Sequence, residues 1–414
     1  MTAGGPLSGT RILELGSFIA GPFAGQLLGD YGADVIKIEP ISGGDPMRHW
    51  GVQRDGDSLW WPTIGRNKQS VCIDVRLPAG QALLRRLSTH VDVIVENFRP
   101  GRLEEWGVGF AALSEANPAM VMAHVSGWGQ TGPRSAAAGF GSIGEAVGGL
   151  RFVTGSPDRP PSRYGVSLGD ELAGMFTVIG VLAALAHART TGVGQEVDVA
   201  IYEAVAALME SSLADFELGG VLRQRSGSVL PGVAPSNTYP TADGTDVLIA
   251  ANADSVYRRL CEVMGRPELA TDMRYATHAA RASNAGELDE VISAWTRTFD
   301  ATRLLDKLEA AGVPAGRIYT ARDMLTDAHY EARDMVLRMA SYQGWTVPMN
   351  GVVPKFTRTP GAVRSTGPRL GEHTRDVLVN IAGVDEGELV SLQRDGVVWC
   401  AAPLDARLDP VPPL

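Results

Sequence analysis

Residues 11–39, RILELGSFIAGPFAGQLLGDYGADVIKIE, predict a strand, a helix and a second strand. The short apolar stretches Arg11–Leu15 and Val35–Glu39 are typical of strands. Between them, Gly21 and Pro22 start a helical stretch that ends near Tyr31, because proline is tolerated in the first turn of a helix. The three elements together form a βαβ unit.

The same order of elements repeats further along the chain. Strands are expected at Ser70–Val75, Val91–Glu96 and Met120–Val125, with helices at Ala79–Thr89 and Phe110–Glu115. Nearly continuous apolar strands that alternate with helices indicate a parallel sheet covered on both faces. We therefore expect an α/β fold, in which ligands bind beyond the carboxyl ends of the strands.

The middle and the end of the chain predict two further segments. A strand and a long helix that reaches about Leu218 close the segment 1–218, and 219–326 then reads as a linker followed by a small α/β domain. Residues 327–414 hold extended pieces at Met335–Ala340 and Val352–Phe356 and a helix to Ile381. This segment is too extended for its own core, so we expect it to return to the first domain or to another subunit.

Composition excludes several classes of protein. The net charge of −10 argues against a nucleic acid partner, because such proteins need a basic face. The three cysteines lie far apart and predict neither disulfides nor a metal site. The start has no secretory signal, and the apolar run Leu172–Ala186 is shorter than a bilayer span. We expect a cytoplasmic protein without a membrane segment.

Polar and aromatic residues follow the predicted strands and suit a nucleotide, although a solvated charged rim would look similar at any single position. They are Lys37, Glu39, Asp74, Arg76, Asn97, Phe98, Arg99 and Arg102. Two GxGxxG matches start at Gly127 and Gly139, but neither lies in the strand–turn–helix setting that a dinucleotide site needs. These glycines favour loops that line a cleft, and the chain has no GxxxxGK[ST] phosphate loop.

The stretch GVSLGDELAGMF, residues 165–176, places Asp170 where a loop turns into a long apolar helix. A carboxylate there lies beside unpaired N–H groups and the positive end of the helix dipole, which keep it ionised. The alternative is that Asp170 only caps the helix, since aspartate is a favoured N-cap residue. The glycines around it allow a bulky ligand to approach the backbone.

Several motifs together resemble the class III CoA-transferases of the CaiB/BaiF type, a family that includes formyl-CoA transferase and α-methylacyl-CoA racemase. The motifs occur in order from Gly9 to about Val398: GTRILELGSFIAGPFAG, GDPMRHW, RNKQSVCIDVR, VENFRPGRLEEWGV, VSGWGQTGP, GVSLGDELAG, TGVGQEVDVAIYEAV and PRLGEHT. The resemblance implies a Rossmann-like large domain built from both chain ends, a small middle domain and an interlocked homodimer. It also implies coenzyme A and acyl-CoA as substrates, small carboxylic acids as partners, and no permanently bound cofactor.

The resemblance implies a role for individual residues. Asp170 is at the position of the family's catalytic aspartate, which attacks the acyl-CoA thioester and carries CoA as an aspartyl thioester. Backbone N–H groups near Gly169 would stabilise the tetrahedral intermediates. The implied CoA contacts are Lys37, Glu39, Ile73, Asp74, Arg76, Asn97, Phe98, Arg99, Arg102 and Phe140, and the implied substrate pocket includes Ile19, Trp50 and Trp60. Phe140 could equally be a core residue, and the two tryptophans could be exposed loop anchors.

The sequence departs from formyl-CoA transferase at several positions. Ile19 stands where that enzyme has a pocket glutamine, and Pro40 and Glu105 stand where it has arginines near CoA. Arg102, one turn before Glu105, is a candidate replacement. The glycine-rich loop that shields the formyl enzyme's intermediate has no counterpart between Thr238 and Gly244. These departures argue against formyl and oxalate as substrates.

Two other functions remain alternatives. A racemase needs a second base beside the aspartate, but Phe140 and Gly141 occupy its GHD-type motif, and His124 lies in a predicted buried strand. A non-catalytic acyl-CoA-binding protein or an NAD-type oxidoreductase is the third hypothesis. The favoured function is CoA transfer from a succinyl-CoA-type donor to a small dicarboxylic or branched acid. Its second carboxylate could meet one of three arginines, Arg48, Arg66 or Arg163.

Overall fold

The computed structural model describes residues 4–402 and divides them into two compact units. The large unit contains residues 4–150, 164–210 and 328–402, and the small unit contains 151–163 and 211–327. The prediction placed the first boundary at 218 and kept 151–163 in the large domain. The structure differs because residues 151–163, which include most of the short helix α7 (Leu150–Val153), group with the middle of the chain.

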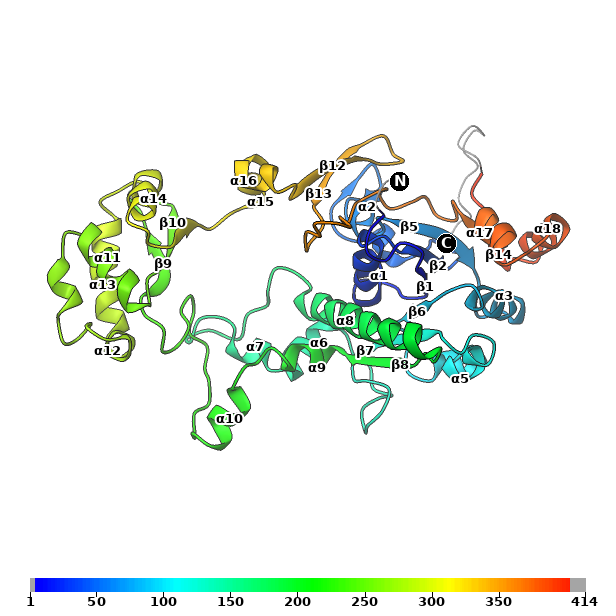
Figure 1. The fold of residues 1–414 in the computed structure, drawn as a ribbon, viewed down its shortest axis with the longest axis horizontal. Coiled ribbons are helices and arrows are strands. Elements are labelled where there is room, and N and C mark those ends of the chain that lie inside the picture. Colours follow the sequence, from blue (N-terminus) through cyan, green and yellow to red (C-terminus); the bar gives the residue numbers. More distant parts are fainter. Residues whose placement is uncertain (1–3, 403–414) are drawn as a thin grey trace. The chain divides into compact units, whose positions relative to one another are not determined.

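A seven-stranded sheet forms the centre of the large unit (Figure 1). All neighbouring strands are parallel except the edge strand β14, which runs antiparallel to β5. The order is β14-β5-β2-β1-β6-β7-β8, so the chain builds outward from β1 on one side and then restarts at β6 on the other. The ends of β1 and β6 therefore form the switch point where ligands bind in such sheets. The strands are β1 Arg11–Glu14, β2 Asp34–Glu39, β5 Lys68–Ile73, β6 Val93–Glu96, β7 Val121–Ser126, β8 Glu196–Ala200 and β14 Val398–Trp399.

Apolar helices cover both faces of this sheet, which confirms the predicted α/β fold. One face packs against α1 (Ala20–Asp30) and α8 (Leu168–Thr191), through residues such as Leu28 and Val181. The opposite face packs against α3 (Pro78–Ser88), α5 (Phe110–Ser114), α17 (Thr374–Asn380) and α18 (Glu386–Arg394). The short helices α2 Trp61–Ile64, α4 Arg102–Glu105, α6 Gly141–Val147, α9 Ile201–Ala206 and α16 Ala328–Ala332 complete the unit.

Helix α8 is long and apolar enough, by length and composition alone, to cross a membrane. Half of its most apolar window is buried inside the protein. It packs along α1 and against β7 and β8 of the sheet (Figure 1). A core helix passes the same test, so this finding is weak evidence for a membrane span.

The end of the chain returns to the large unit and extends its sheet. Val398 pairs with Ile73, and the hydroxyl of Thr374 accepts a hydrogen bond from the Cys72 amide at 2.9 Å. Before this, β12 (Val336–Ala340) and β13 (Thr346–Asn350) form a hairpin. The predicted extended piece at Val352–Phe356 is not a strand, because the second hairpin strand ends at Asn350. A second hairpin joins β3 (Gln53–Arg54) and β4 (Asp57–Ser58).

The small unit has its own sheet and core. The antiparallel strands β9 (Ser236–Pro240), β10 (Asp246–Ala250) and β11 (Ala315–Arg317) pack against α11, α13 and α14 around the buried Tyr239, Tyr257 and Leu304. Strand β9 lies in the stretch that we interpreted as a linker, because its polar sequence SNTYP carries no strand pattern. The helices are α10 Ser212–Glu217, α11 Asp254–Val263, α12 His278–Ser283, α13 Ala285–Thr296, α14 Ala301–Ala310 and α15 Ala321–Thr326.

The long helix that we predicted up to Leu218 is wrong. The chain forms α9 and then, after a break, α10, with Glu210 in the left-handed region at a φ of 51°. A non-glycine residue in this conformation cannot continue a right-handed helix. Apolar residues continue through the break at Leu208 and Met209, so periodicity alone did not reveal it.

Two buried lysines lie between the first strands of the sheet. Lys37 is 1% exposed and its Nζ lies 2.8 Å from Glu14 and 2.8 Å from Asp45, while Lys68 Nζ lies 2.8 Å from Glu14. Burial opposes the charge of Lys37, but Asp45 and Glu14 outweigh it and raise its pKa. At Lys68 burial prevails over Glu14 and lowers the pKa to about 8. Glu14 therefore pairs with both buried lysines, and Asp45 supplies the second negative charge.

Replacing Glu14 should destabilise the protein strongly. Glu14→Gln leaves two buried ammonium groups with too little negative charge, and breaking a buried pair in this way costs about 3–5 kcal/mol. Urea unfolding at neutral pH measures the loss. The control is Arg375→Gln, which removes an exposed ion pair with Glu386 and should cost less than about 1 kcal/mol. Equal losses in both variants would contradict the role given to Glu14.

Candidate active site

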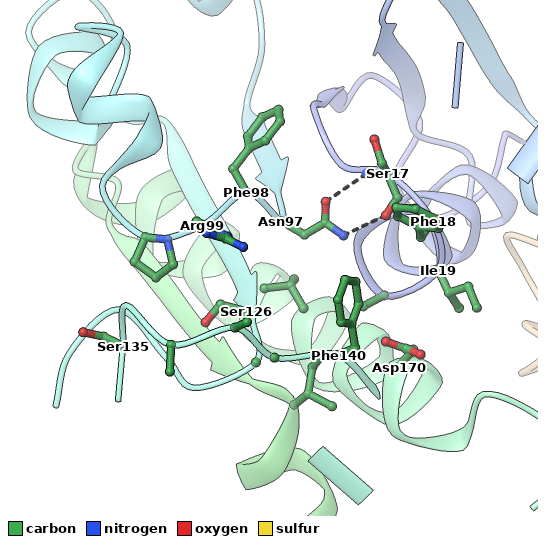
Figure 2. A pocket seen from close by; sticks show the side chains of 18 residues that line it. Ser17, Phe18, Ile19, Asn97, Phe98, Arg99, Ser126, Ser135, Phe140 and Asp170 are labelled. Atoms are coloured by element: carbon green, nitrogen blue, oxygen red, sulfur yellow. Dashed lines mark hydrogen bonds between the residues drawn. The ribbon is translucent and has the colours of Figure 1, made fainter. Parts of the chain in front are cut away.

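A cavity of about 290 Å³ opens at the switch point of the sheet (Figure 2). Its walls come from the loop after β1, the loop after β6, the end of β7 and the starts of α6 and α8. The lining residues include Ser17, Phe18, Ile19, Asn97, Phe98, Arg99, Ser126, Phe140 and Asp170. Chain segments that are far apart in sequence thus meet around one carboxylate.

Asp170 lies in the first turn of α8, which begins at Leu168 with Ser167 as its N-cap. The alternative that Asp170 is the cap residue is therefore wrong. Its carboxylate packs against Gly141, where a Cβ atom would lie only 2.2 Å from Oδ2 of Asp170. The side chain reaches the cavity at the positive end of a 24-residue helix, a position that favours negative charge.

Gly169 is packed closely against α6. A Cβ atom there would lie 2.9 Å from the carbonyl oxygen of Gly141, and the Gly169 amide donates a long hydrogen bond of 3.4 Å to Glu145. Glu145 is 1% exposed and was not among the predicted residues. The Gly169 amide is thus engaged with Glu145 in this structure, which differs from its expected role towards an oxyanion.

The loop of residues 16–18 after β1 is held in place from several sides. Asn97 binds Ser17 twice, since its Oδ1 accepts from the Ser17 amide and its Nδ2 donates to the Ser17 carbonyl, both at 2.8 Å (Figure 2). Asp45 accepts from the Phe18 amide at 3.2 Å, and Lys37 donates to the Gly16 carbonyl at 2.8 Å. Phe18 has a φ of 66°, which costs a non-glycine residue roughly 1–2 kcal/mol. The surrounding hydrogen bonds offset this strain.

These contacts correct the prediction for Lys37. Its ammonium group is buried and surrounded by Glu14, Asp45 and the Gly16 carbonyl, so it has no surface left for a CoA phosphate. Glu39 is also 1% exposed, and Arg48 holds both of its carboxylate oxygens at 2.7 and 2.8 Å. Burial raises the pKa of Glu39, but the Arg48 guanidinium outweighs it and lowers the pKa to about 2. Lys37 therefore holds the loop of residues 16–18 in place and does not line the cavity.

A second cavity of about 200 Å³ adjoins the first one and shares Ser17 and Phe98 with it. Its lining includes four predicted CoA contacts besides Phe98, namely Glu39, Ile73, Asp74 and Arg76. The Phe98 ring makes a T-shaped contact with Trp106, with ring centroids 5.3 Å apart. The Arg76 guanidinium hydrogen-bonds Asp74 and lowers the pKa of its carboxyl group. Aromatic surface beside an exposed cation suits a nucleotide.

The remaining predicted CoA contacts divide into two groups. Arg99 and Phe140 line the cavity of Asp170, and Phe140 is 69% exposed, which excludes the alternative that it is a core residue. Within residues 4–402 the Arg99 guanidinium has no ion pair and can meet an anionic group. Arg102, which we considered as a replacement, lines neither cavity and forms an exposed ion pair with Glu105 at 2.7 Å.

The predicted substrate-pocket residues lie near Phe18. Ile19 is buried and lines the cavity, whereas Trp50 and Trp60 are absent from its lining. Trp50 makes a T-shaped contact with Phe18 at 5.3 Å between centroids, and Trp60 lies 6.5 Å from Trp50. Trp50 thus contacts Phe18 directly, and Trp60 contacts Trp50.

The three arginines proposed for a second carboxylate are not in the cavity. Arg48 is held by Glu39, and Arg66 forms a buried pair with Asp30. Arg163 belongs to the small unit. Buried ion pairs cannot be recognised in one sequence, because their partners lie elsewhere in the chain.

The sequence analysis missed four residues that line the two cavities, namely Ser17, Phe18, Ser126 and Trp106. Ser17 and Phe18 follow shortly after the first predicted strand.

Comparisons with known proteins agree with this fold. The model of CoA-transferase family III matches residues 7–374. The chain is 53% identical to succinyl-CoA–D-citramalate CoA-transferase of Chloroflexus aurantiacus, over 95% of this chain and 98% of that protein. It is 38% identical to the beta subunit of succinyl-CoA–L-malate CoA-transferase of the same organism, with the same coverage. A CAIB/BAIF family protein from Brucella suis has a similar structure, with a TM-score of 0.81, 33% identity and coverage of 91% of this chain and 100% of that one.

Replacing Asn97 should loosen the loop of residues 16–18. Asn97→Ala removes two hydrogen bonds to Ser17 and should cost about 1–3 kcal/mol locally, so hydrogen exchange at the Ser17 and Phe18 amides should accelerate. Asn117→Ala is the matched control, because the Asn117 side chain also makes two hydrogen bonds to the backbone, donating to the Ser88 and Val91 carbonyls. Unchanged exchange at Ser17 in the Asn97 variant would show that this loop is held by other means.

Proposed function

The chain belongs to CoA-transferase family III, and on this premise we propose that it transfers CoA from succinyl-CoA to a small dicarboxylic acid with Asp170 as the covalent carrier. The observation that carries the proposal is the position of Asp170, in the first turn of α8 and in the wall of the switch-point cavity. A carboxylate at a helix N-terminus stays ionised. It is then available as a nucleophile.

The proposed reaction proceeds through exchanges of acyl bonds. An Asp170 oxygen attacks the thioester carbonyl of succinyl-CoA, the C–S bond breaks, and a mixed anhydride and CoA thiolate form. The thiolate attacks the aspartyl carbonyl of the anhydride, which releases succinate and leaves an aspartyl-CoA thioester. The acceptor acid then reverses these two steps and leaves with CoA. Every bond broken is replaced by one formed, so atoms and charge balance without a further reactant.

The two adjoining cavities suit the two ends of the substrate. The cavity with Asp170 and Ile19 would hold the acyl group and thiol end, and the second cavity with Arg76 and Trp106 would hold the nucleotide. Phe98 lines both, so the pantetheine arm would pass along it. This assignment rests on the chemistry of the lining residues: apolar walls around one carboxylate, and an aromatic surface beside a cation.

The names of the relatives support the substrate class. Two of them act on D-citramalate and L-malate with succinyl-CoA, and both acceptors are small dicarboxylic acids. Racemisation is disfavoured, because the residues that line the Asp170 cavity, all within 4–402, include no histidine as a second base. The interlocked homodimer and the absence of a permanently bound cofactor stay predictions from the resemblance, and the cytoplasmic location stays a prediction from composition.

Asp170→Asn should abolish turnover and leave CoA binding intact. The amide is nearly isosteric but a far poorer nucleophile, so activity should fall by at least about a thousandfold. An assay with succinyl-CoA and a series of dicarboxylic acceptors measures turnover, and calorimetry measures CoA binding. Glu171→Gln, the acid next in the same turn, is the control and should keep its activity. Normal turnover by the Asp170 variant would refute the proposal.

Gly141→Ala should impair the chemical step more than binding. The new Cβ would clash with the Asp170 carboxylate and rotate it, and a displacement of about 1 Å can cost about a hundredfold in rate. Steady-state kinetics should show a lower kcat with little change in KM for succinyl-CoA. Ser142→Ala, one residue further along α6 and exposed, is the matched control. A kcat equal in both variants would mean that Asp170 does not react from the position seen here.

A further inference from the structure

A buried histidine lies between two carboxylates near one edge of the sheet, on the strand next to the edge strand β8. His124 on β7 is 3% exposed. Its Nδ1 lies 2.6 Å from Oε1 of Glu96 on β6, and its Nε2 lies 3.1 Å from Oε1 of Glu196 on β8. The burial confirms the expectation that His124 is a core histidine. His124, Glu96 and Glu196 together form a charged trio on three neighbouring strands.

The geometry determines the protonation of His124. A neutral imidazole has one donor nitrogen and one acceptor nitrogen. Here both ring nitrogens face carboxylate oxygens, which accept hydrogen bonds when ionised. Both nitrogens can donate only in the imidazolium form. With both carboxylates ionised, the trio requires a positive charge on the ring. Burial raises the pKa of Glu96, and the hydrogen bond and charge of His124 oppose that shift.

Glu96 connects this trio to the candidate active site. Its second oxygen, Oε2, accepts a hydrogen bond from the Phe98 amide at 2.7 Å. Phe98, like Ser17, lines both cavities, and its ring packs against Trp106 in the second one. The Glu96 carboxylate thus binds His124 with one oxygen and the backbone of the cavity wall with the other.

We propose that His124 is a positioning residue of the acyl-CoA site, whose imidazolium fixes Glu96 and through it the Phe98 segment. This inference rests on the proposed function, because it assigns Phe98 to the CoA path. It makes CoA affinity depend on pH through a group that touches no substrate atom. The ring acts through one carboxylate and one backbone amide.

The charged groups around His124 set the direction of this dependence. Burial alone would lower the pKa of His124, but the hydrogen bond and charge of Glu96, helped by Glu196, outweigh it and raise the pKa. Glu104 of α4 adds negative charge near Glu96. Asp198, opposite His124 on β8, accepts from the Gln130 amide instead. The protonated trio is present below the raised pKa and is lost as pH rises through it, so CoA binding should weaken on the alkaline side.

Calorimetric binding of CoA from about pH 6 to about pH 9 tests the inference. The wild type should bind more weakly as pH rises. His124→Gln, which cannot carry the charge, should bind about tenfold more weakly at the lower pH and lose this transition. Glu196→Gln leaves the Phe98 contact intact and should only move the transition to lower pH. The phosphates of CoA titrate in the same way in every experiment, so the result is read from the differences in CoA affinity between the variants and the wild type.

Two outcomes would overturn the inference in distinguishable ways. If His124→Gln binds CoA as the wild type does at every pH, the positioning role fails while the proposed function stands. If the wild type does not bind CoA at all, both fail. Long-range ¹⁵N–¹H spectra of the wild-type ring provide a check that does not depend on the variant's folding. They should show the imidazolium pattern of His124 at neutral pH, and a neutral ring would contradict the proposal.

Discussion

The double hydrogen bond between Asn97 and Ser17 joins the loops that follow β1 and β6, the two neighbouring strands at the switch point. A parallel sheet opens a crevice where its strand order reverses, and this amide ties the loops on the two sides of the crevice together. Lys37 and Asp45 form hydrogen bonds with backbone groups of the same loop. The cavity around Asp170 keeps its shape because polar groups from several strands fix one short stretch of backbone.

The sequence predicted the central sheet well, because buried parallel strands such as Val35–Glu39 and Met120–Val125 are continuous apolar runs. Asp170 was found from its glycine-rich setting and from the resemblance of the surrounding motif. The roles of Lys37, Arg48 and Arg66 were not predictable, since their partners include residues such as Asp45 and Asp30 that periodicity does not connect. The break at Glu210 was missed for a different reason: one left-handed residue leaves no trace in an apolar pattern.

In this site the residue proposed to react faces the cavity, and buried charged residues hold the surrounding backbone in place. Asp170 faces the cavity and is limited by Gly141, whose lack of a side chain leaves room for the carboxylate. Two of the charged residues that the sequence assigned to CoA, Lys37 and Glu39, lie beneath the surface, where they pair with Glu14 and Arg48. Partnered buried charges give a defined geometry, and removing one partner is costly. Glu96 and His124 extend this arrangement to the Phe98 segment.

The most direct test of the account is the chemical state of residue 170 during turnover. The protein is mixed with succinyl-CoA, quenched in acid, digested and analysed by mass spectrometry. The account predicts a peptide that carries CoA as a thioester on the side chain of Asp170, and this adduct should disappear when an acceptor acid is added. CoA attached to another residue, or transfer that proceeds with no adduct on the protein, would contradict it.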